Sequence, residues 1–282
     1  VRCVRLVVLL VIGVGMLGWP ARAASAGGVP TLSVTPGSVT FAGNTRVGVA
    51  APVQTLVISN AVASQPLSYS AATSSPSQFP LTCAGGGTAC LSGTIAAGNS
   101  AQVQVGFVPS AVGVRTGTVT LSTNDPDPPD ANKTINVSGT GAISTLTGGA
   151  AIAFGTIDIN AASGVTQSYT IGNSGGVSLD LVGNMTITGD AGGNFSFAFG
   201  SCTTGQTCST LPSVAAGGNT SITLRCDPST IGAKTGTLNI PTDDPASPKT
   251  VALTCTGATP DLLIAGTPLA DFGSQRINTT SA

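Results

Sequence analysis

The stretch GNSAQVQVGFVPSAVGVRTGTVTLSTNDP, a polar turn and then KTINVSGTG run from Gly98 to Gly141, and a second version of this stretch runs from Gly217 to Gly257. The second version reads GGNTSITLRCDPSTIGAKTGTLNIPTDDP, a shorter turn and KTVALTCTG. Four positions recur at a constant spacing of 119 residues, as in 228 minus 109: Pro109 and Pro228, Gly113 and Gly232, Gly117 and Gly236, and Asp125 and Asp244. A constant spacing over such a length indicates an internal duplication.

Apolar and polar side chains alternate within each version, which is the two-residue period of a half-buried β-strand. Pro, Gly and Asp turns separate the alternating runs, so the pattern predicts an all-β fold of tandem antiparallel β-sandwiches. The runs are Val103 to Phe107, Val119 to Leu121 and Ile135 to Val137 in the first version, and Ile222 to Cys226, Leu238 to Ile240 and Val251 to Leu253 in the second.

The amino-acid composition argues against several classes of function. Charged residues make up 7% of the 282 residues, the formal net charge is −1 and there is no histidine. A chain without a basic cluster lacks the usual footprint of nucleic-acid binding and of attachment to anionic membranes. A chain without histidine cannot form Ser-His-Asp, Cys-His or His-metal sites. The sequence therefore predicts a protein that is not an enzyme, with no catalytic residue and no cofactor.

The first 23 residues predict a secretory signal peptide. Arg2 and Arg5 precede an apolar run from Leu6 to Leu17, and small residues surround the expected cleavage site after Ala23. The alternative is a transmembrane anchor, but that needs roughly 20 apolar residues and this run is shorter. We therefore expect export to the cell surface or the medium, with no membrane insertion after cleavage.

The duplication sets the expected domain boundaries. A small-residue leader spans residues 24–30, and the two sandwich repeats span residues 31–142 and 143–258. A third repeat starts within residues 259–282, because Phe272 follows Phe154 by 118 residues, as 272 minus 154. This last segment is expected to be the truncated start of a further domain.

Seven cysteines are present, and the expected cleavage removes Cys3. Six cysteines remain, and an even number of cysteines in an exported chain predicts disulfides. Cys226 and Cys255 stand at inward strand positions where the first repeat has Phe107 and Gly139, so a buried disulfide is expected to replace a large-plus-small packing pair. A metal site is disfavoured, because the chain has no histidine and no C-x-x-C motif. The two other expected pairs close small loops: Cys83 with Cys90, and Cys202 with Cys208.

Acidic turns leave a calcium alternative open. Asp125, Asp127 and Asp130 cluster in one turn, and Asp243 and Asp244 lie in its counterpart. Oxygen-rich loops of this kind can bind calcium. Asp and Asn before Pro also stabilise turns through side-chain bonds to the local backbone, and this second interpretation is preferred.

Short motifs recur along the chain: F-G at Phe154-Gly155 and Phe272-Gly273, F-x-P at Phe107 to Pro109, N-D-P at Asn124 to Pro126 and G-T-G at Gly139 to Gly141. Together they resemble the immunoglobulin-like domain of the abnormal-spindle and hydin (ASH, HYDIN) family, which in exported bacterial proteins occurs in the choice-of-anchor D group. The resemblance covers roughly residues 31–272 and implies a sandwich of about seven strands, used in tandem for protein contact without catalytic residues. Departures are Cys226 for the Phe of F-x-P, Cys255 for the first Gly of G-T-G, and the turn after Asn60.

The expected function is a non-catalytic, secreted or surface-displayed array of domains that acts as a spacer or as an adhesion-like module binding a protein or cell-surface partner. One alternative is a set of accessory domains of an exported enzyme whose catalytic domain lies beyond Ala282. Another is a ciliary or cytoskeletal scaffold of the eukaryotic family type, which the signal peptide disfavours.

Overall fold

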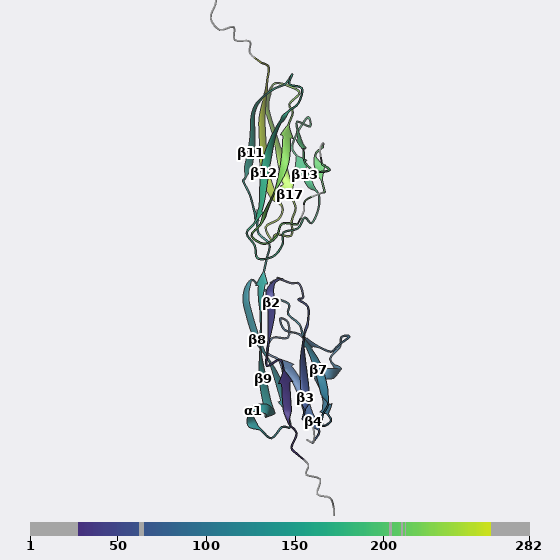
Figure 1. Ribbon diagram of the computed structural model, residues 1–282. Coiled ribbons are helices and arrows are strands. Elements are labelled where there is room, and N and C mark those ends of the chain that lie inside the picture. Colours follow the sequence, from purple (N-terminus) through teal and green to yellow (C-terminus); the bar gives the residue numbers. More distant parts are fainter. Residues whose placement is uncertain (1–27, 62–64, 203–204, 210, 212, 261–282) are drawn as a thin grey trace, which may run out of the picture.

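The computed structural model shows two β-sandwiches that follow each other along the chain (Figure 1). It describes residues 28–61, 65–202, 205–209, 211 and 213–260. No helix in these ranges is both long and apolar enough to cross a membrane. The expected signal peptide (1–23), residues 24–27 of the expected leader and residues 261–282 of the expected third repeat lie outside the described residues.

The first sandwich pairs a sheet of order β1-β3-β7-β5 with a sheet of order β2-β9-β8-β4-β6. If β1 and β2 are counted as two halves of a split first strand, these orders match the ABED and GFC sheets of an immunoglobulin-like domain. The bounds are β1 Leu32–Thr35, β2 Ser38–Arg46, β3 Gln54–Asn60, β4 Leu67–Thr73, β5 Leu81–Thr82, η1 Ala89–Leu91, β6 Ser92–Ile95, β7 Ser100–Val105, β8 Gly113–Thr123, α1 Pro128–Ala131 and β9 Asn132–Ala142.

The second sandwich repeats this topology, with one sheet of order β10-β12-β16-β14 and another of order β11-β18-β17-β13-β15. Both repeats are therefore immunoglobulin-like sandwiches, as the sequence predicts. The bounds are β10 Leu146–Thr147, β11 Ala151–Asp158, β12 Val165–Asn173, β13 Met185–Thr188, β14 Phe195–Phe197, β15 Thr207–Cys208, β16 Asn219–Cys226, β17 Gly232–Ile240 and β18 Lys249–Ala258.

The split first strand joins the two sheets of each sandwich. β1 pairs antiparallel with β3, and the chain then crosses to the other sheet, where β2 pairs parallel with β9 from Ser38↔Asn136 to Arg46↔Ala142. In the second repeat β10 pairs with β12 and β11 runs parallel to β18. The crossing carries the end of β2 alongside the end of β9, next to the start of the second repeat.

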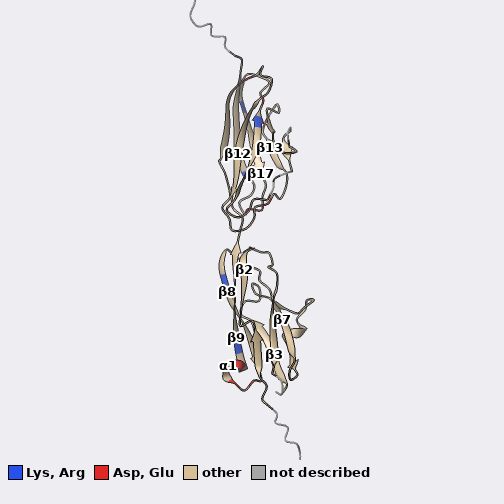
Figure 2. Ribbon diagram, in the orientation of Figure 1, with Lys and Arg blue, Asp and Glu red and all other residues tan. Residues whose placement is uncertain are grey.

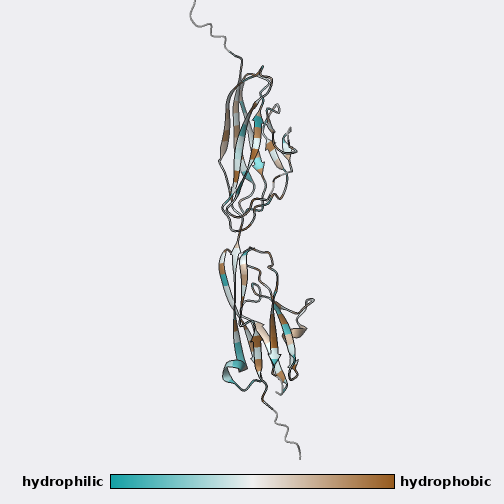
Figure 3. Ribbon diagram, viewed as in Figure 1, coloured by the Kyte–Doolittle hydropathy of each residue, from teal (hydrophilic) through white to brown (hydrophobic). Residues whose placement is uncertain are grey.

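The alternating runs supply the core. Hydrophobic positions alternate along the strands of both sandwiches (Figure 3), while charged residues are scarce on both (Figure 2). Phe107 packs on Phe41 and Phe79 with ring centroids 5.3 and 5.2 Å away. In the second core Phe154 and Phe195 lie 5.8 Å apart. Residues with no exposed surface include Val103, Val105, Phe107, Val119 and Leu121 in the first repeat and Ile222, Leu224, Cys226, Leu238 and Ile240 in the second.

Candidate functional site at the junction of the two repeats

Three consecutive residues that enter the second repeat are each held by a side chain of that repeat. The Ser144 hydroxyl donates to Asp243 Oδ1 at 2.9 Å, and the Thr145 N–H donates to Asn173 Oδ1 at 3.1 Å. The Leu146 N–H donates to Asp244 Oδ2. Because Ser144 has no exposed surface, this segment is part of the second sandwich and is not a free linker.

Arg46 reaches from the first repeat into the same place. Its guanidinium lies 2.8 Å from Asp243 Oδ2 and 3.8 Å from Asp180 Oδ2. It also donates to the Ser144 hydroxyl at 3.3 Å and to the Ser178 carbonyl. The planar guanidinium offers five donors, so one side chain can hold several acceptors at once. We call Arg46, Ser144, Asp180 and Asp243 the junction cluster.

The cluster is only partly open to water, which sets its strength. Side-chain exposure is 25% for Arg46, 21% for Asp243 and 48% for Asp180. Fully exposed ion pairs contribute about 0–1 kcal/mol each. The Arg46 contact with Asp243 is the more shielded and the closer of the two, so we expect it to dominate. Asn44 adds an uncharged contact, since its side-chain amide donates to the Gly176 carbonyl at 2.8 Å.

The start of the first repeat has the same frame without the ion pairs. Asn60 Oδ1 accepts from the Thr31 N–H at 3.2 Å, and Asp125 Oδ2 accepts from the Leu32 N–H at 2.7 Å. Asn124 stands where the second repeat has Asp243, and its Oδ1 accepts from the Ser68 N–H at 2.8 Å. Asp243 Oδ1 accepts from the Asp180 N–H in the same way, at 3.1 Å. The second carboxylate oxygen of Asp243 is thus what the second repeat adds for Arg46.

The acidic turns considered for calcium are occupied by backbone and side-chain donors. Asp125 Oδ1 accepts from the Asp127 N–H at 2.9 Å and Asp244 Oδ1 from the Ala246 N–H at 2.7 Å. Asp130 pairs with Lys133 at 2.9 Å, and this contact raises the pKa of Lys133 above its usual value. Within the described residues no group of three or more metal-ligating side chains is present. These bonds support the interpretation of N-D-P as a turn that also anchors the first strand.

All six cysteines outside the expected signal peptide form disulfides. Cys83 bonds to Cys90 and Cys202 to Cys208, closing loops with sequence separations of 7 and 6. Cys226 bonds to Cys255 between β16 and β18. Three disulfides fit an extracellular protein.

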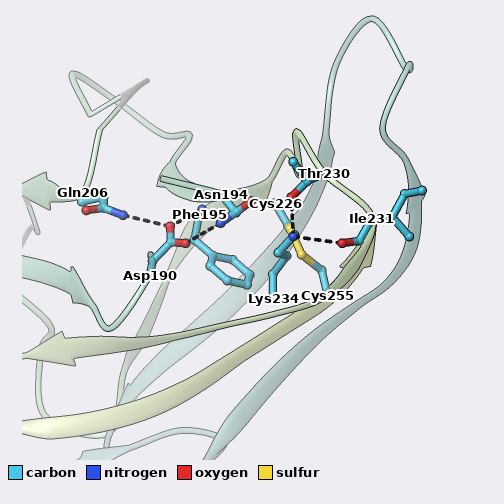
Figure 4. The surroundings of a disulfide bond; sticks show 9 residues. All are labelled: Asp190, Asn194, Phe195, Gln206, Cys226, Thr230, Ile231, Lys234 and Cys255. Carbon is cyan, nitrogen blue, oxygen red and sulfur yellow. Dashed lines mark hydrogen bonds between the residues drawn. A yellow bond between two sulfur atoms is a disulfide. The ribbon is translucent and has the colours of Figure 1, made fainter. Parts of the chain in front are cut away.

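The interior disulfide takes the place of an aromatic contact. In the first repeat Gly139 leaves room for Phe107, because a Cβ at Gly139 would lie 2.5 Å from Phe107 Cε1. In the second repeat Cys226 and Cys255, with 0% and 4% exposure, fill the same two positions (Figure 4). The large-plus-small pair and the disulfide are therefore alternative ways of filling one site.

Other polar side chains near this disulfide hold loops. Lys234 Nζ donates to Thr230 Oγ1 at 2.7 Å and to the Ile231 carbonyl (Figure 4). Arg115, its counterpart at 234 minus 119, donates to the Ala111 and Val112 carbonyls. Each basic side chain thus bonds to the loop that follows Pro109 or Pro228 in its own repeat. Arg46 differs from both because its partners lie in the other repeat.

Asp190 organises the loop before Phe195. Its Oδ1 accepts from Asn194 Nδ2 at 2.7 Å, and its Oδ2 accepts from the Phe195 N–H at 2.7 Å and from Gln206 Nε2 at 2.9 Å (Figure 4). All three donors belong to the second repeat, so the carboxylate is a loop anchor and takes no part in the junction. The sequence did not single out Asp190, Arg46 or Asp180, because none of them recurs as the same residue in the other repeat.

No protein-family model matches this sequence, and no protein of curated function matches it either. Among solved structures, a protein of unknown function from Porphyromonas gingivalis is similar at 14% identity and a TM-score of 0.32, over 80% of this chain and 99% of that one. The ASH/PapD-like domain of human CEP192 is similar at 15% identity and 0.30, over 47% and 97%. The adhesin InvE of Yersinia pseudotuberculosis is similar at 11% identity and 0.31, over 80% and 58%.

Likenesses at these TM-scores carry no argument about function. The immunoglobulin-like fold rests instead on the strand order and register of both sandwiches. Membership of the abnormal-spindle and hydin family, and of its choice-of-anchor D group, stays a prediction from the sequence.

Proposed function

We propose that this protein is an exported, non-catalytic spacer and protein-binding array, in which the junction cluster holds neighbouring immunoglobulin-like domains end to end. The observation that supports this most directly is the guanidinium of Arg46 at the end of β2, whose acceptors within the described residues all lie in the segment 144–243. A spacer has to fix the direction in which its domains follow one another. A side chain that joins one domain to the next at several acceptors restricts that direction.

Composition supports the absence of catalysis and the location. The histidine-free sequence removes the common nucleophile and metal chemistries. The three disulfides fit an oxidising compartment, in agreement with the expected signal peptide. The partner in this proposal is a protein or a cell-surface component, and neither nucleic acid nor a membrane is involved.

The test measures whether the two sandwiches reorient relative to each other. Residual dipolar couplings of backbone amides give an alignment tensor for each sandwich, and two sandwiches held rigidly share one tensor. We expect a shared tensor for the unaltered chain and distinct tensors for Arg46→Ala, because the variant loses the ion pairs and the bonds to Ser144 and Ser178.

Arg115→Ala is the matched control, since it removes an arginine from the same repeat that bonds only to its own loop. This control should keep the shared tensor. Distinct tensors in the unaltered chain, or a shared tensor in Arg46→Ala, would contradict the spacer proposal. Raising the salt concentration should move the unaltered chain toward the Arg46→Ala result, because partly exposed ion pairs are screened.

A further inference from the structure

One strand of the second repeat has an open edge. β12 pairs with β16 from Val165↔Cys226 to Gly172↔Asn219, but on its other side it pairs with β10 only at Asn173 and Gly172. Within the described residues no strand covers that side of β12 from Val165 to Ile171. An uncovered strand edge presents unpaired N–H and C=O groups that another extended chain can bind.

The first repeat covers more of the same edge. β1 pairs with β3 over four positions, from Leu32↔Asn60 to Thr35↔Val57. Thr170 is the counterpart of Val57, because 170 minus 57 is 113, which is also the spacing of Asn60 and Asn173. On this side Val57 therefore has the paired neighbour Thr35, whereas Thr170 pairs only with Ser221 on the opposite side.

β10 ends early because, compared with the first repeat, one residue at this edge is larger and the residue facing it is smaller. Tyr169 replaces Leu56, and Gly148 replaces Val34. A Cβ at Gly148 would overlap the Tyr169 hydroxyl, so only glycine fits beside that ring. The hydroxyl donates to the Gly149 carbonyl at 2.8 Å, which holds the chain over the ring on its way to β11. The chain thus leaves the edge of β12 two positions earlier than β1 leaves the edge of β3.

A groove of about 760 Å³ lies along this edge. Gly148, Gly149, Ile152, Gln167 and Tyr169 are among its lining residues, and no charged residue lines it within the described part of the chain. The strand itself, Val165–Asn173, contains neither a charged residue nor a proline. Charges and prolines are what natural edge strands use to prevent pairing, so this edge has no such protection.

The direction of the backbone groups defines the geometry of binding. The Asn173 N–H donates to Gly218 on the β16 side and the Ser174 N–H donates to Thr145 on the opposite side. Backbone groups of successive residues alternate between the two sides of an antiparallel strand. The N–H and C=O groups of Thr166, Ser168 and Thr170 therefore point to the open edge, and their side chains are exposed.

We propose that the open edge of β12 binds an extended, uncharged segment of a partner protein, which adds a strand to the sheet. The backbone of Ser168 and Thr170 would bond to the incoming strand, and the neutral lining favours side chains without charge, because burying an unpaired charge is costly. Gly149 adds no side chain to this lining, and a Cβ there would meet only ordinary contacts at 3.8 and 3.9 Å. This inference rests on the proposed binding function and names the surface and the partner chemistry for it.

The test uses a synthetic peptide, acetyl-Thr-Leu-Ser-Val-Thr-amide, which copies Thr31–Thr35, the segment whose last four residues form β1 on the equivalent edge of β3. Amide chemical shifts of the full chain are followed as the peptide rises to millimolar concentration. We expect shifts at Thr166, Ser168 and Thr170, and several-fold weaker binding when the peptide serine is replaced by glutamate. Before the peptide is added, the Thr170 amide should exchange with solvent much faster than that of Val57.

Two variants block the edge in different ways. Ser168→Pro removes the outward N–H, which leaves the bonds to β16 in place, and Ser168→Lys keeps the N–H but puts a charge beside the groove. Both should abolish the shifts. Thr55→Pro and Thr55→Lys are the matched controls, because Thr55 is the counterpart of Ser168 on β3, as 168 minus 55 is 113. Both controls should retain the peptide shifts on β12.

Each other outcome overturns the proposal. Absence of shifts at the β12 edge at millimolar peptide would show that the edge does not accept a strand. Self-association of the unaltered chain in sedimentation that Ser168→Lys removes would identify a second copy as the occupant instead. Neither result affects the tensors that report on Arg46, so failure of this inference is distinguishable from failure of the spacer proposal.

Discussion

The two sandwiches share a strand order and differ in how they fill it. The first core stacks Phe107 between Phe41 and Phe79, whereas the second has a disulfide at the position of Phe107 and Gly139. The first repeat covers its β3 edge with a four-residue strand, whereas the second ends that strand after two residues over Tyr169. The comparison indicates that strand order depends on the alternating pattern, while individual core and edge positions can exchange large for small residues or packing for a covalent bond.

The largest expected effects come from removing the residues that fill the two cores differently. Phe107→Ala removes a fully buried ring and should lower the unfolding free energy of the first sandwich by about 3–5 kcal/mol. Replacing both Cys226 and Cys255 by alanine should cost the second sandwich about 3–4 kcal/mol, from loss of a loop with sequence separation 29. Unfolding in denaturant, monitored through the amide hydrogen exchange of each sandwich separately, measures both losses.

A further variant gives the second core the Phe and Gly pair of the first. Cys226→Phe combined with Cys255→Gly should recover part of the lost stability, and that recovery should be insensitive to reductant. If the double alanine variant unfolds at the same denaturant concentration as the unaltered chain, the disulfide does not carry the role that Phe107 has in the first repeat.

An intermediate effect concerns the anchors of the first strands. Asp125→Ala should cost the first sandwich about 1–3 kcal/mol, since the Leu32 N–H loses its acceptor, and Asp244→Ala should act similarly on the second. Asp127→Ala is the control, because its turn is the same but its side chain does not hold a first strand. Calcium at millimolar concentration should leave all unfolding free energies unchanged, and a calcium-dependent gain lost in Asp125→Ala would favour the metal alternative.

The smallest effect compares the two tyrosines. Burial raises the pKa of Tyr69 and of Tyr169 above 10.0, and these are the only tyrosines in the chain. Because the folded state favours the neutral phenol, this contribution to stability is fully present below pH 10 and is lost as the pH rises through the folded pKa. Absorbance titration at alkaline pH should give a midpoint above 10, and Tyr169→Phe should leave only the Tyr69 transition. A midpoint at 10 or below would show that neither ring is shielded.

The sequence predicted what depends on periodicity. The buried strands, the duplication and the pairing of Cys226 with Cys255 follow from side chains that alternate along a strand and from positions that recur in the second repeat. It missed β1 and β10, because four and two residues are too few to show a period. It also missed the open edge, since the exchange of Leu56 for Tyr169 and of Val34 for Gly148 becomes visible only when the register is known.

The junction cluster could not be predicted from the sequence for a different reason. Arg46 and Asp180 have no repeated counterpart of the same charge, since Asp158 ends β11 as Arg46 ends β2 and Ser68 stands in place of Asp180. A feature that occurs once in a duplicated chain leaves no pattern to detect. Asp243 was noticed only as part of an acidic turn, and its partner from the other repeat appeared only with the fold.

The position of the Arg46 acceptors also orders events during synthesis. Asp243 follows Arg46 by 197 residues, as 243 minus 46, and follows Ser144 by 99. The first sandwich has all its strands once residue 142 has emerged, whereas the segment after it gains its holding side chains only when nearly all of the second repeat is available. A chain that folds from its amino terminus therefore completes the first sandwich before Arg46 can meet Asp243, and the direction of one sandwich relative to the other is fixed last.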